Sequence, residues 1–324
     1  KYLDKWEELT LKKYLNYTLI LIALSLIVLS GCSLPGLGDG NAKDDVKITT
    51  TETSETKIIG HMEKLLIEHE TDGKIKPTLI GNLGSSIIQH NALQRGDANM
   101  SAVRYTGTEL TSVLAAKPTK DPDKAMSETQ RLFKKKYDEK YYHSLGFANT
   151  YAFMVTKETA KKYHLKKVSD LEKYKDELRL GMDTQWMNRA GDGYPAFVKD
   201  YGFKFDSARP MQIGLVYDAL KNNKLDVAVG YSTDGRIAAY DLKILEDDRK
   251  FFPPYDGSPL ANEQLIKDNP EIDKALKKLE GKISTEEMQK LNYEADGKGK
   301  EPAVIAEEYL KKHHYFEEKK GGHK

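Results

Sequence analysis

Short apolar runs and apolar positions with helical spacing alternate along most of the chain. β-branched or apolar runs predict strands, and apolar residues that recur every three or four positions predict helices. The predicted strands are residues 46–51, 76–80, 100–105, 151–155, 178–182, 225–231 and 242–245. The predicted helices are residues 55–69, 85–95, 108–115, 121–138, 194–201, 212–222, 262–280, 285–291 and 302–314. This alternation favours an α/β fold with mostly parallel sheets.

The amino-terminal part has a different pattern. A lysine pair precedes an apolar run over residues 19–29, and small residues follow that run. A positive flank, a short apolar core and small residues before a cleavage site are typical of a secretory signal peptide. The run is too short to span a bilayer, which takes about 20 helical residues. We expect residues 1–31 to hold upstream residues, with a start near Leu11, and a signal peptide.

The end of that run, Leu-Ser-Gly-Cys at residues 29–32, resembles the lipobox of bacterial lipoproteins. The resemblance implies cleavage before Cys32, diacylation of its thiol, and a lipid anchor on the extracytoplasmic face of a Gram-positive-like cell membrane. A signal anchor with an incidental cysteine is the alternative. Residues 32–45 are rich in Ser, Pro, Gly, Asn and Asp, which predicts a flexible linker. Residues 317–324 predict a polar tail.

Composition narrows the classes of function. A chain of 324 residues is long enough for about two domains of roughly 100–200 residues each. With 51 basic and 50 acidic residues, the net charge of +1 gives no attraction to nucleic acid. One cysteine excludes a disulfide-based fold. No spacing of His, Cys or carboxylates suits a metal, and no nucleophile lies with a base, so we expect no metal, cofactor or catalytic residue.

Tyrosine is the abundant aromatic residue, with 19 copies against nine Phe and two Trp. Tyr105, Tyr231 and Tyr255 fall at the ends of predicted strands or in the loops after them, and Tyr151 begins a strand. Ligands of open α/β sheets bind beyond the carboxyl ends of strands. A tyrosine at such a position is more often a half-buried packing residue, so the surrounding sequence has to decide.

The surrounding stretches resemble the substrate-binding lipoproteins of osmoprotectant ABC transporters, which bind glycine betaine, carnitine and choline. The stretches are residues 104–110, 149–153, 191–194, 211–218, 230–236, 252–256 and 291–294. The resemblance runs from the lipobox to about Tyr315. It implies a two-lobed periplasmic-binding-protein fold, type II-like, with crossover strands and a ligand cleft between the lobes. Lobe 1 would comprise residues 46–148 plus 252–316, and lobe 2 residues 149–251.

The resemblance also implies site residues. In the family four tyrosines form a cage around the ammonium, and the motifs carry these roles onto Tyr105, Tyr151, Tyr231 and Tyr255. Thr108 and Asn149 match positions that bind the polar end of the ligand or shape the cleft. Family members often have Gln in the loop after the first strand. This chain has no Gln there; we expect Thr53 in its place, with Thr51 as the fallback.

The implied function is extracytoplasmic capture of a quaternary amine and delivery to an ABC permease with its ATPase subunits, by a monomer that is not an enzyme. A trimethylammonium group has no N–H to donate, so aromatic faces suit it better than carboxylates do. One alternative keeps the fold but takes another betaine, such as an imidazole betaine. A second alternative is a surface hydrolase that uses Asp234 or Asp256.

Overall fold

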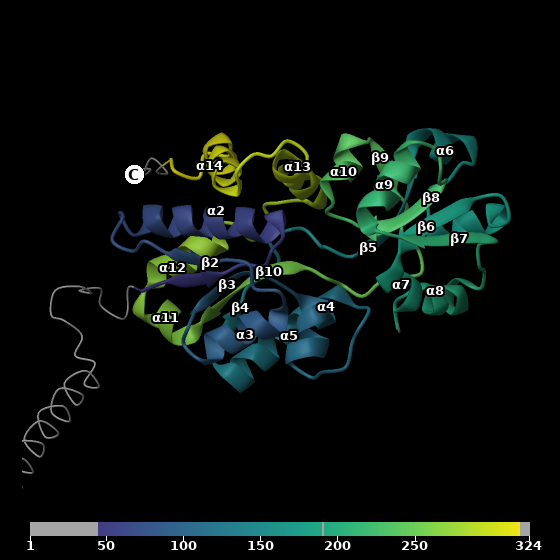
Figure 1. The fold of residues 1–324 in the computed structure, drawn as a ribbon. Coiled ribbons are helices and arrows are strands. Elements are labelled where there is room, and N and C mark those ends of the chain that lie inside the picture. The colour runs from purple at the N-terminus through teal and green to yellow at the C-terminus, as the bar shows by residue number, and fades with distance from the viewer. Residues whose placement is uncertain (1–44, 190, 318–324) are drawn as a thin grey trace, which may run out of the picture. The chain divides into compact units, whose positions relative to one another are not determined.

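Two five-stranded sheets form the frame of the protein in the computed structural model, which describes residues 45–189 and 191–317. The first sheet has the strand order β2-β1-β3-β10-β4 and the second the order β7-β6-β8-β5-β9 (Figure 1). The first sheet consists of β1 (Lys47–Thr49), β2 (Thr78–Ile80), β3 (Met100–Tyr105), β4 (Glu139–Tyr141) and β10 (Gly257–Asn262). The second consists of β5 (Tyr151–Thr156), β6 (Arg179–Asp183), β7 (Ser207–Met211), β8 (Val227–Tyr231) and β9 (Leu242–Ile244).

The strand directions differ from the sequence-based expectation. β1 is parallel to β2 and β3, and β6 is parallel to β7 and β8. β10 is antiparallel to β3 and β4, and β5 is antiparallel to β8 and β9. The prediction of mostly parallel sheets is therefore wrong. β5 and β10 each follow a segment that leads from one sheet to the other. Both strands run antiparallel to their neighbours in the sheet that they join. We call these segments, residues 142–150 and 245–256, the crossover segments.

Helices cover both sheets. Those in the part of the chain that forms the first sheet are α2 (Ser54–Glu70), α3 (Ser86–Gln94), α4 (Thr106–Thr108), α5 (Pro122–Tyr137), α11 (Glu263–Asp268), α12 (Pro270–Lys277), α13 (Thr285–Asp296) and α14 (Pro302–Lys312). Those in the part that forms the second are α6 (Lys157–Lys162), α7 (Thr184–Asn188), α8 (Tyr194–Tyr201), α9 (Ile213–Lys221) and α10 (Gly235–Ala239). A π-helix (Glu109–Val113) continues α4, and a 3₁₀-helix (Val168–Tyr174) precedes β6.

Local sequence explains where the longer helices begin. The Thr53 hydroxyl accepts from the backbone N–H of Thr56 and caps α2, and the Ser284 hydroxyl caps α13 in the same way. Asp121 caps α5, whose first residue is proline. Side-chain oxygens at these positions satisfy N–H groups that have no partner inside the helix, and proline fits the first helical position.

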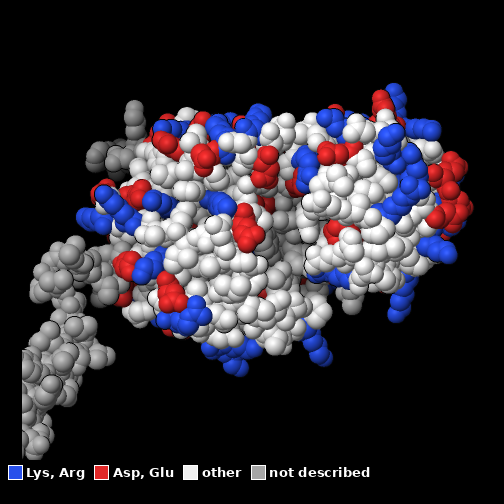
Figure 2. Space-filling model, viewed as in Figure 1, with Lys and Arg blue, Asp and Glu red and all other residues white. Residues whose placement is uncertain are grey.

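Each sheet has its own apolar core. The core of the first sheet joins Ile48 and Met100 to apolar residues of α2, α12, α13 and α14. The core of the second is aromatic and includes Phe153, Trp186 and Phe197, all within 1% of full burial. α10 packs against α13, so a helix beyond β8 contacts one beyond β10. Basic and acidic side chains are interspersed over much of the face shown in Figure 2.

Most predicted elements are confirmed, and the differences have identifiable causes. The predicted helix over 262–280 is two helices, because Pro270 begins α12. The predicted helix over 108–115 is the short α4 followed by the π-helix. β4, β7 and β10 were not predicted.

The predicted boundaries fall partly outside the described residues. The expected upstream residues, signal peptide, Cys32 and nearly all of the linker and tail lie outside the described residues. The predicted lobes, residues 46–148 with 252–316 and residues 149–251, remain a prediction. The membership of the two sheets supports them, since residues 47–141 and 257–262 supply the first and residues 151–244 the second.

Candidate functional site

Tyr151 and Tyr231 form a pair at the ends of two neighbouring strands. Tyr151 begins β5, Tyr231 ends β8, and the antiparallel register places them directly opposite each other. Their ring centroids lie 5.0 Å apart, and their hydroxyl oxygens are 3.5 Å apart. Opposed residues of antiparallel strands project to the same face of the sheet. Burial raises the pKa of Tyr151, so its ring stays neutral at ordinary pH.

The backbone of Tyr231 is held by Tyr217 of α9. The N–H of Tyr231 donates to the Tyr217 hydroxyl oxygen at 2.7 Å, and that hydroxyl donates to the carbonyl of Tyr231 at 3.2 Å. Gly230 permits this approach, because a Cβ there would lie 2.4 Å from the Tyr217 oxygen. Arg236 lies 4.3 Å from the Tyr217 ring centroid and forms an ion pair with Asp234. The stretch over residues 230–236 thus fixes the position of Tyr231.

Tyr105 and Tyr255 lie where the first sheet meets a crossover segment. Tyr105 ends β3 and pairs with Gly257, the first residue of β10. Tyr255 comes two residues before that strand, so the register brings it close to the end of β3. Burial is the main cause that raises the pKa of Tyr255 to about 12, and the negative charge of Asp192 adds to it.

Hydrogen bonds to backbone carbonyls tie the two crossover segments to each other and to α4. The Thr106 hydroxyl donates to the carbonyl of Pro254 at 3.0 Å, and the N–H of Asn149 donates to the carbonyl of Tyr255 at 3.1 Å. Gly107 packs against the Tyr255 ring, where a Cβ would lie 3.1 Å from a ring carbon and 2.7 Å from the Pro254 carbonyl. The absence of a side chain at Gly107 therefore lets α4 support the Tyr255 ring.

Glu55, in the first turn of α2, connects several parts of the site. Its carboxylate accepts a hydrogen bond from the Tyr105 hydroxyl, one from the Asn149 amide at 3.2 Å and one from the Asn292 amide at 3.3 Å. Thr233, just beyond β8, also hydrogen-bonds it. We call Glu55, Tyr105, Asn149, Asn292 and Thr233 the Glu55 cluster. Glu55 is only 2% exposed, although carboxylates are rarely buried without a basic partner.

Arg189, in the loop after α7, brings a positive charge to the tyrosines. Its Nη2 donates to the Tyr255 hydroxyl at 3.0 Å, and its guanidinium lies 5.8 Å from the Tyr151 ring centroid. Its Nε donates to Asp192 at 2.5 Å. The guanidinium has five N–H donors, so two contacts leave others available. Arg189 links Tyr255 of a crossover segment to Tyr151 of the second sheet.

The other predicted residues have varied surroundings. The Asn149 side-chain oxygen is buried without a hydrogen-bond partner in the described part of the chain. Thr108 is half-buried, and its carbonyl accepts from Thr111. The hydroxyls of Thr51 and Thr53 bond each other at 3.1 Å, and Thr53 is exposed. No contact in the described residues brings either threonine to the tyrosines.

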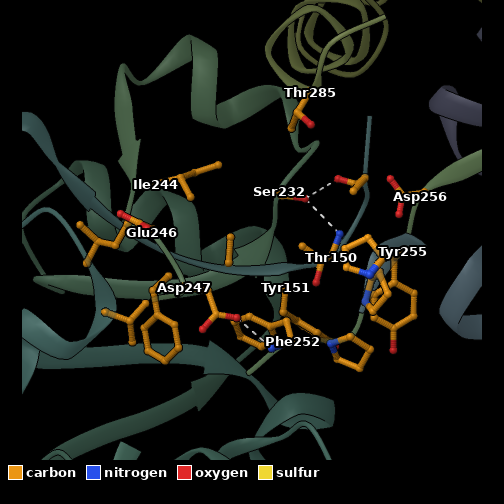
Figure 3. A pocket seen from close by; sticks show the side chains of 18 residues that line it. Thr150, Tyr151, Ser232, Ile244, Glu246, Asp247, Phe252, Tyr255, Asp256 and Thr285 are labelled. Carbon is orange, nitrogen blue, oxygen red and sulfur yellow. Dashed lines mark hydrogen bonds between the residues drawn. The ribbon is translucent and has the colours of Figure 1, made fainter. Parts of the chain in front are cut away.

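A cavity of about 430 Å³ borders the crossover segments (Figure 3). Tyr151 and Tyr255 line it, together with Ser232, whose hydroxyl donates to the carbonyl of Ala148 at 2.8 Å. Tyr105 and Tyr231 are not among the residues that line it. Of the four tyrosine rings, only those of Tyr151 and Tyr231 contact each other in the described part of the chain. The rings of Tyr151 and Tyr231 thus contact each other directly. Tyr105 and Tyr255 are connected to the site by hydrogen bonds, to Glu55 and Arg189 respectively.

Two residues at the site, Glu55 and Arg189, were missed by the sequence analysis. A signal existed for Arg189, because it lies two residues before the stretch over residues 191–194 that carries part of the resemblance. Glu55 gave no signal beyond its place in the first turn of a helix.

In residues 45–189 and 191–317, none of the helices is both long and apolar enough to cross a membrane. The same residues contain no cluster of three or more His, Cys, Asp or Glu suited to a metal ion.

Comparison with known proteins decides the family. The model of the substrate-binding domain of the ABC-type glycine betaine transport system matches residues 44–312. The chain belongs to this family. It is therefore an extracytoplasmic substrate-binding component of an ABC importer, as the resemblance implied. Family members are transport proteins and not enzymes, which overturns the hydrolase alternative with Asp234 or Asp256.

Individual relatives agree with the family. The carnitine transport binding protein OpuCC of Listeria monocytogenes serotype 1/2a (strain 10403S) is 52% identical over 308 residues, which cover 95% of this chain and 99% of that protein. A crystal structure of a glycine betaine/carnitine/choline ABC transporter is 68% identical with a TM-score of 0.83, and the match covers 84% of this chain and 100% of the other. The predicted two-lobed binding-protein fold is confirmed.

A more distant relative is the ergothioneine transport permease/ergothioneine binding protein EgtU of Helicobacter pylori (strain G27). It is 32% identical over 265 residues, which cover 82% of this chain and 47% of that protein.

Proposed function

We propose that this binding protein captures a quaternary ammonium osmoprotectant, namely carnitine, glycine betaine or choline, and delivers it to an importer permease driven by ATPase subunits. The observation that carries the proposal is the Tyr151–Tyr231 pair, with ring centroids 5.0 Å apart at the ends of β5 and β8. The names of the Listeria relative and of the transporter structure support the same class of ligand.

The chemistry of the ligand explains the use of tyrosine. The positive charge of a trimethylammonium group is spread over methyl groups that cannot donate a conventional hydrogen bond. An aromatic face offers these methyl groups apolar contact and a negative quadrupole together. Four faces at about 1–2 kcal/mol each give about 4–8 kcal/mol. A dissociation constant of about 1 μM corresponds to a net binding free energy of about 8 kcal/mol. The contacts must also offset the entropy lost on association, so polar contacts and closure have to contribute in addition to the aromatic faces.

The proposed cage consists of Tyr105, Tyr151, Tyr231 and Tyr255. One pair is in contact, and the other two tyrosines reach the site through Glu55 and Arg189. We propose that the lobes close on the ligand, because a ligand that contacts both lobes favours the conformation that supplies all four faces. The permease would recognise this closed form.

The polar end of the ligand would meet different groups. The guanidinium of Arg189 beside Tyr255 suits the carboxylate of carnitine or glycine betaine, since Arg binds carboxylates in a planar, two-bond geometry. The unpartnered oxygen of Asn149 suits the hydroxyl of choline or carnitine. Thr108 lies in α4 beside Gly107, and we propose that it contacts the polar end of the ligand. Thr53 and Thr51 stay proposals as well, although the hydroxyl of Thr53 already caps α2.

The test is calorimetric titration of the chain from Ala42 onward, which forms one compact unit. The titrants are carnitine, glycine betaine, choline and, as the control without methyl groups, glycine. We expect binding near micromolar for at least one methylated ligand and none for glycine. The absence of binding to all three methylated ligands would refute the proposed ligand class.

The alternative ligand class is an imidazole betaine. It is favoured by one observation, the 32% identity to a Helicobacter protein named for ergothioneine. Ergothioneine carries the same trimethylammonium group, so it would use the same tyrosines. It also carries an imidazole ring, which the three acyclic ligands lack. We expect this ring to lie near Thr53, at the place where the family often has glutamine. Competition between ergothioneine and carnitine in the same titration separates the two classes.

We also propose that Cys32 carries the lipid anchor and that the protein acts as a monomer. The sequence around Cys32 and its place before a polar linker support the anchor. Labelling of the producing cells with palmitate should mark the wild-type protein and leave Cys32→Ala unmarked. Sedimentation of the chain from Ala42 should give the mass of a single copy, with and without ligand.

A further inference from the structure

The Glu55 cluster contains a buried carboxylate without a basic partner. The hydrogen-bond donors to Glu55 are a phenol, two amides and a hydroxyl, all neutral. No Lys, Arg or His in the described residues forms an ion pair with it. Burial without a counter-charge is unfavourable for a carboxylate, even where hydrogen bonds satisfy its oxygens. Burial raises the pKa of Glu55, and its hydrogen bonds oppose that rise. A bound cation would supply the counter-charge that favours the ionised form.

The nearby acids differ from Glu55 in their partners. Asp192 lies 3.4 Å from the Tyr255 hydroxyl, but Arg189 neutralises it at 2.5 Å. Asp183 caps α7 by accepting from the N–H of Trp186 at 2.6 Å. Asp183 is also buried and forms no ion pair in the described residues, but it bonds no cage hydroxyl. Glu55 is therefore the acid at the site that bonds a cage hydroxyl and has no cation of its own.

Tyr105 connects this charge to the proposed cage. Its hydroxyl donates to Glu55, and its ring is one of the four proposed faces. A hydrogen bond to an ionised acceptor is stronger than one to a neutral acceptor, and it polarises the donor. A polarised phenol has more electron density on its ring, so its face attracts a cation more strongly. The bond also fixes the orientation of the ring.

We propose that Glu55 is the positioning and counter-charge residue for the bound ammonium, acting through the Tyr105 hydroxyl. The inference rests on the proposed function, because it requires Tyr105 to face an ammonium group. Glu55 would not touch the ligand. It would give the cage its preference for a cation over an uncharged molecule of the same shape, which four neutral tyrosines provide only in part.

The substitution that tests this is Glu55→Gln, which keeps the shape and the acceptor oxygen and removes the charge. Two ligand pairs differ only by carbon in place of the charged nitrogen. They are choline with 3,3-dimethylbutan-1-ol and glycine betaine with 3,3-dimethylbutanoate. We expect Glu55→Gln to weaken binding of the ammonium member at least about tenfold and of the carbon member less than about threefold.

A matched control lies on the same helix. Glu63 is fully buried in α2, eight residues beyond Glu55, and its carboxylate oxygens have no hydrogen-bond partner in the described residues. At about 1.5 Å per residue it lies about 12 Å further along the helix. Burial without any such partner raises the pKa of Glu63 well above its usual value. Glu63→Gln therefore alters a buried acid of the same helix that bonds no cage hydroxyl, and we expect it to leave the preference for the ammonium ligand unchanged.

A second variant decides the matter if Glu55→Gln fails to fold or if the carbon ligands bind too weakly to measure. Tyr105→Phe keeps the ring and removes the link to Glu55. If Glu55→Gln does not fold, Tyr105→Phe alone should weaken binding of the ammonium member at least about tenfold and of the carbon member less than about threefold. If only the carbon ligands fail, the double variant should lose little more ammonium binding than either single variant.

The outcomes are distinct. Failure of the wild-type protein to bind any ammonium ligand refutes the proposed function itself. Wild-type binding together with an unchanged affinity of Glu55→Gln, an equal loss for both members of a pair, or additive losses in the double variant overturns the role of Glu55. A selective loss for the ammonium member, or a non-additive double variant, supports it.

Discussion

At the scale of single residues, the proposed cage depends on tyrosines whose positions are set by their neighbours. Tyr231 is held through its backbone by Tyr217, and Tyr151 stands opposite it in the sheet. Each ring can therefore meet a ligand with little loss of side-chain freedom on binding. Residues that are ordered before binding lose less conformational entropy when the ligand binds. Removal of one such ring should therefore lower the affinity by the full contribution of its contact.

Tyr231→Ala should weaken binding of the preferred methylated ligand at least about tenfold, the equivalent of about 1.4 kcal/mol. The change removes one face and leaves Tyr151 without its ring partner. Calorimetric titration measures the loss. The control is Tyr163→Ala, which breaks another tyrosine pair, Tyr163 with Tyr174 at 4.8 Å, neither of which lines the cavity. An unchanged affinity of Tyr231→Ala would contradict the cage.

Arg189 should decide how the protein treats carboxylated ligands. Arg189→Gln removes the positive charge beside Tyr255, so binding of glycine betaine and carnitine should fall about tenfold more than binding of choline. The control is Arg179→Gln, which removes an arginine paired with Asp226 at the start of β6. Titration of all three ligands gives the ratio. Equal losses for choline and glycine betaine would show that Arg189 only supports the fold.

At the scale of helices and strands, the sequence predicted an element correctly where residues within that element determine its structure. β3 was predicted with its observed limits, because Met100–Tyr105 is a short, mostly apolar or aromatic run that Thr106 and Gly107 follow. β10 was missed, because Gly257–Asn262 contains Gly, Ser, Pro and Asn and becomes a strand through its pairing with β3 and β4. Strand propensity depends strongly on such tertiary context.

The candidate site likewise contains residues that the sequence predicted and residues that it did not. The positions of the tyrosines at strand ends could be anticipated from runs and breaks along the chain. Glu55 could not, because its burial needs Tyr105, Asn149 and Asn292 from three other segments. Their meeting depends on the path of the crossover segments, which no local pattern encodes.

β4 contains an acid that should make stability depend on pH. Gln94 donates to Glu139 at 2.9 Å, and the second carboxylate oxygen is buried without a partner in the described residues. Burial outweighs the nearby Arg104 and raises the pKa of Glu139 from 4.5 to about 7. The folded protein then binds this proton more tightly than the unfolded chain does. The free energy of unfolding should therefore fall as pH rises from about 4.5 to about 7, by up to about 3 kcal/mol.

Glu139→Gln removes this titration. Its free energy of unfolding relative to the wild type should increase over the same pH range and stay constant above about pH 7. Urea unfolding at several pH values measures the difference. The control is Glu128→Gln, which alters an exposed acid whose pKa is lowered by a hydrogen bond from Arg131, so no such increase is expected. A difference independent of pH for Glu139→Gln would mean that Glu139 is ionised in the folded protein.

At the scale of the whole molecule, buried contacts of α13 with the loop after β8 join the two sheets. The Gln289 amide donates to the carbonyl of Ser232 at 2.7 Å, and the Asn292 amide donates to that of Thr233 at 2.8 Å. The pair Lys120–Asp200, between the segment before α5 and α8, is exposed on both sides. Exposed pairs contribute about 0–1 kcal/mol. The helices α10 and α13 and the crossover segments provide the lasting connection. We therefore expect the proposed closure of the lobes to draw much of its free energy from the ligand and the four proposed aromatic faces.

Ligand binding should consequently reduce the radius of gyration of the chain from Ala42 onward, as measured by small-angle X-ray scattering at saturating carnitine or glycine betaine. Glycine should leave it unchanged. Tyr231→Ala at ligand concentrations that restore saturation should show a smaller reduction, because one of the faces that favour the closed form is absent. Lys120→Gln should close as the wild type does, since the exposed pair contributes little. An unchanged radius of gyration in the saturated wild-type protein would show that the ligand is bound without closure, and the permease would then have to recognise something other than a closed form.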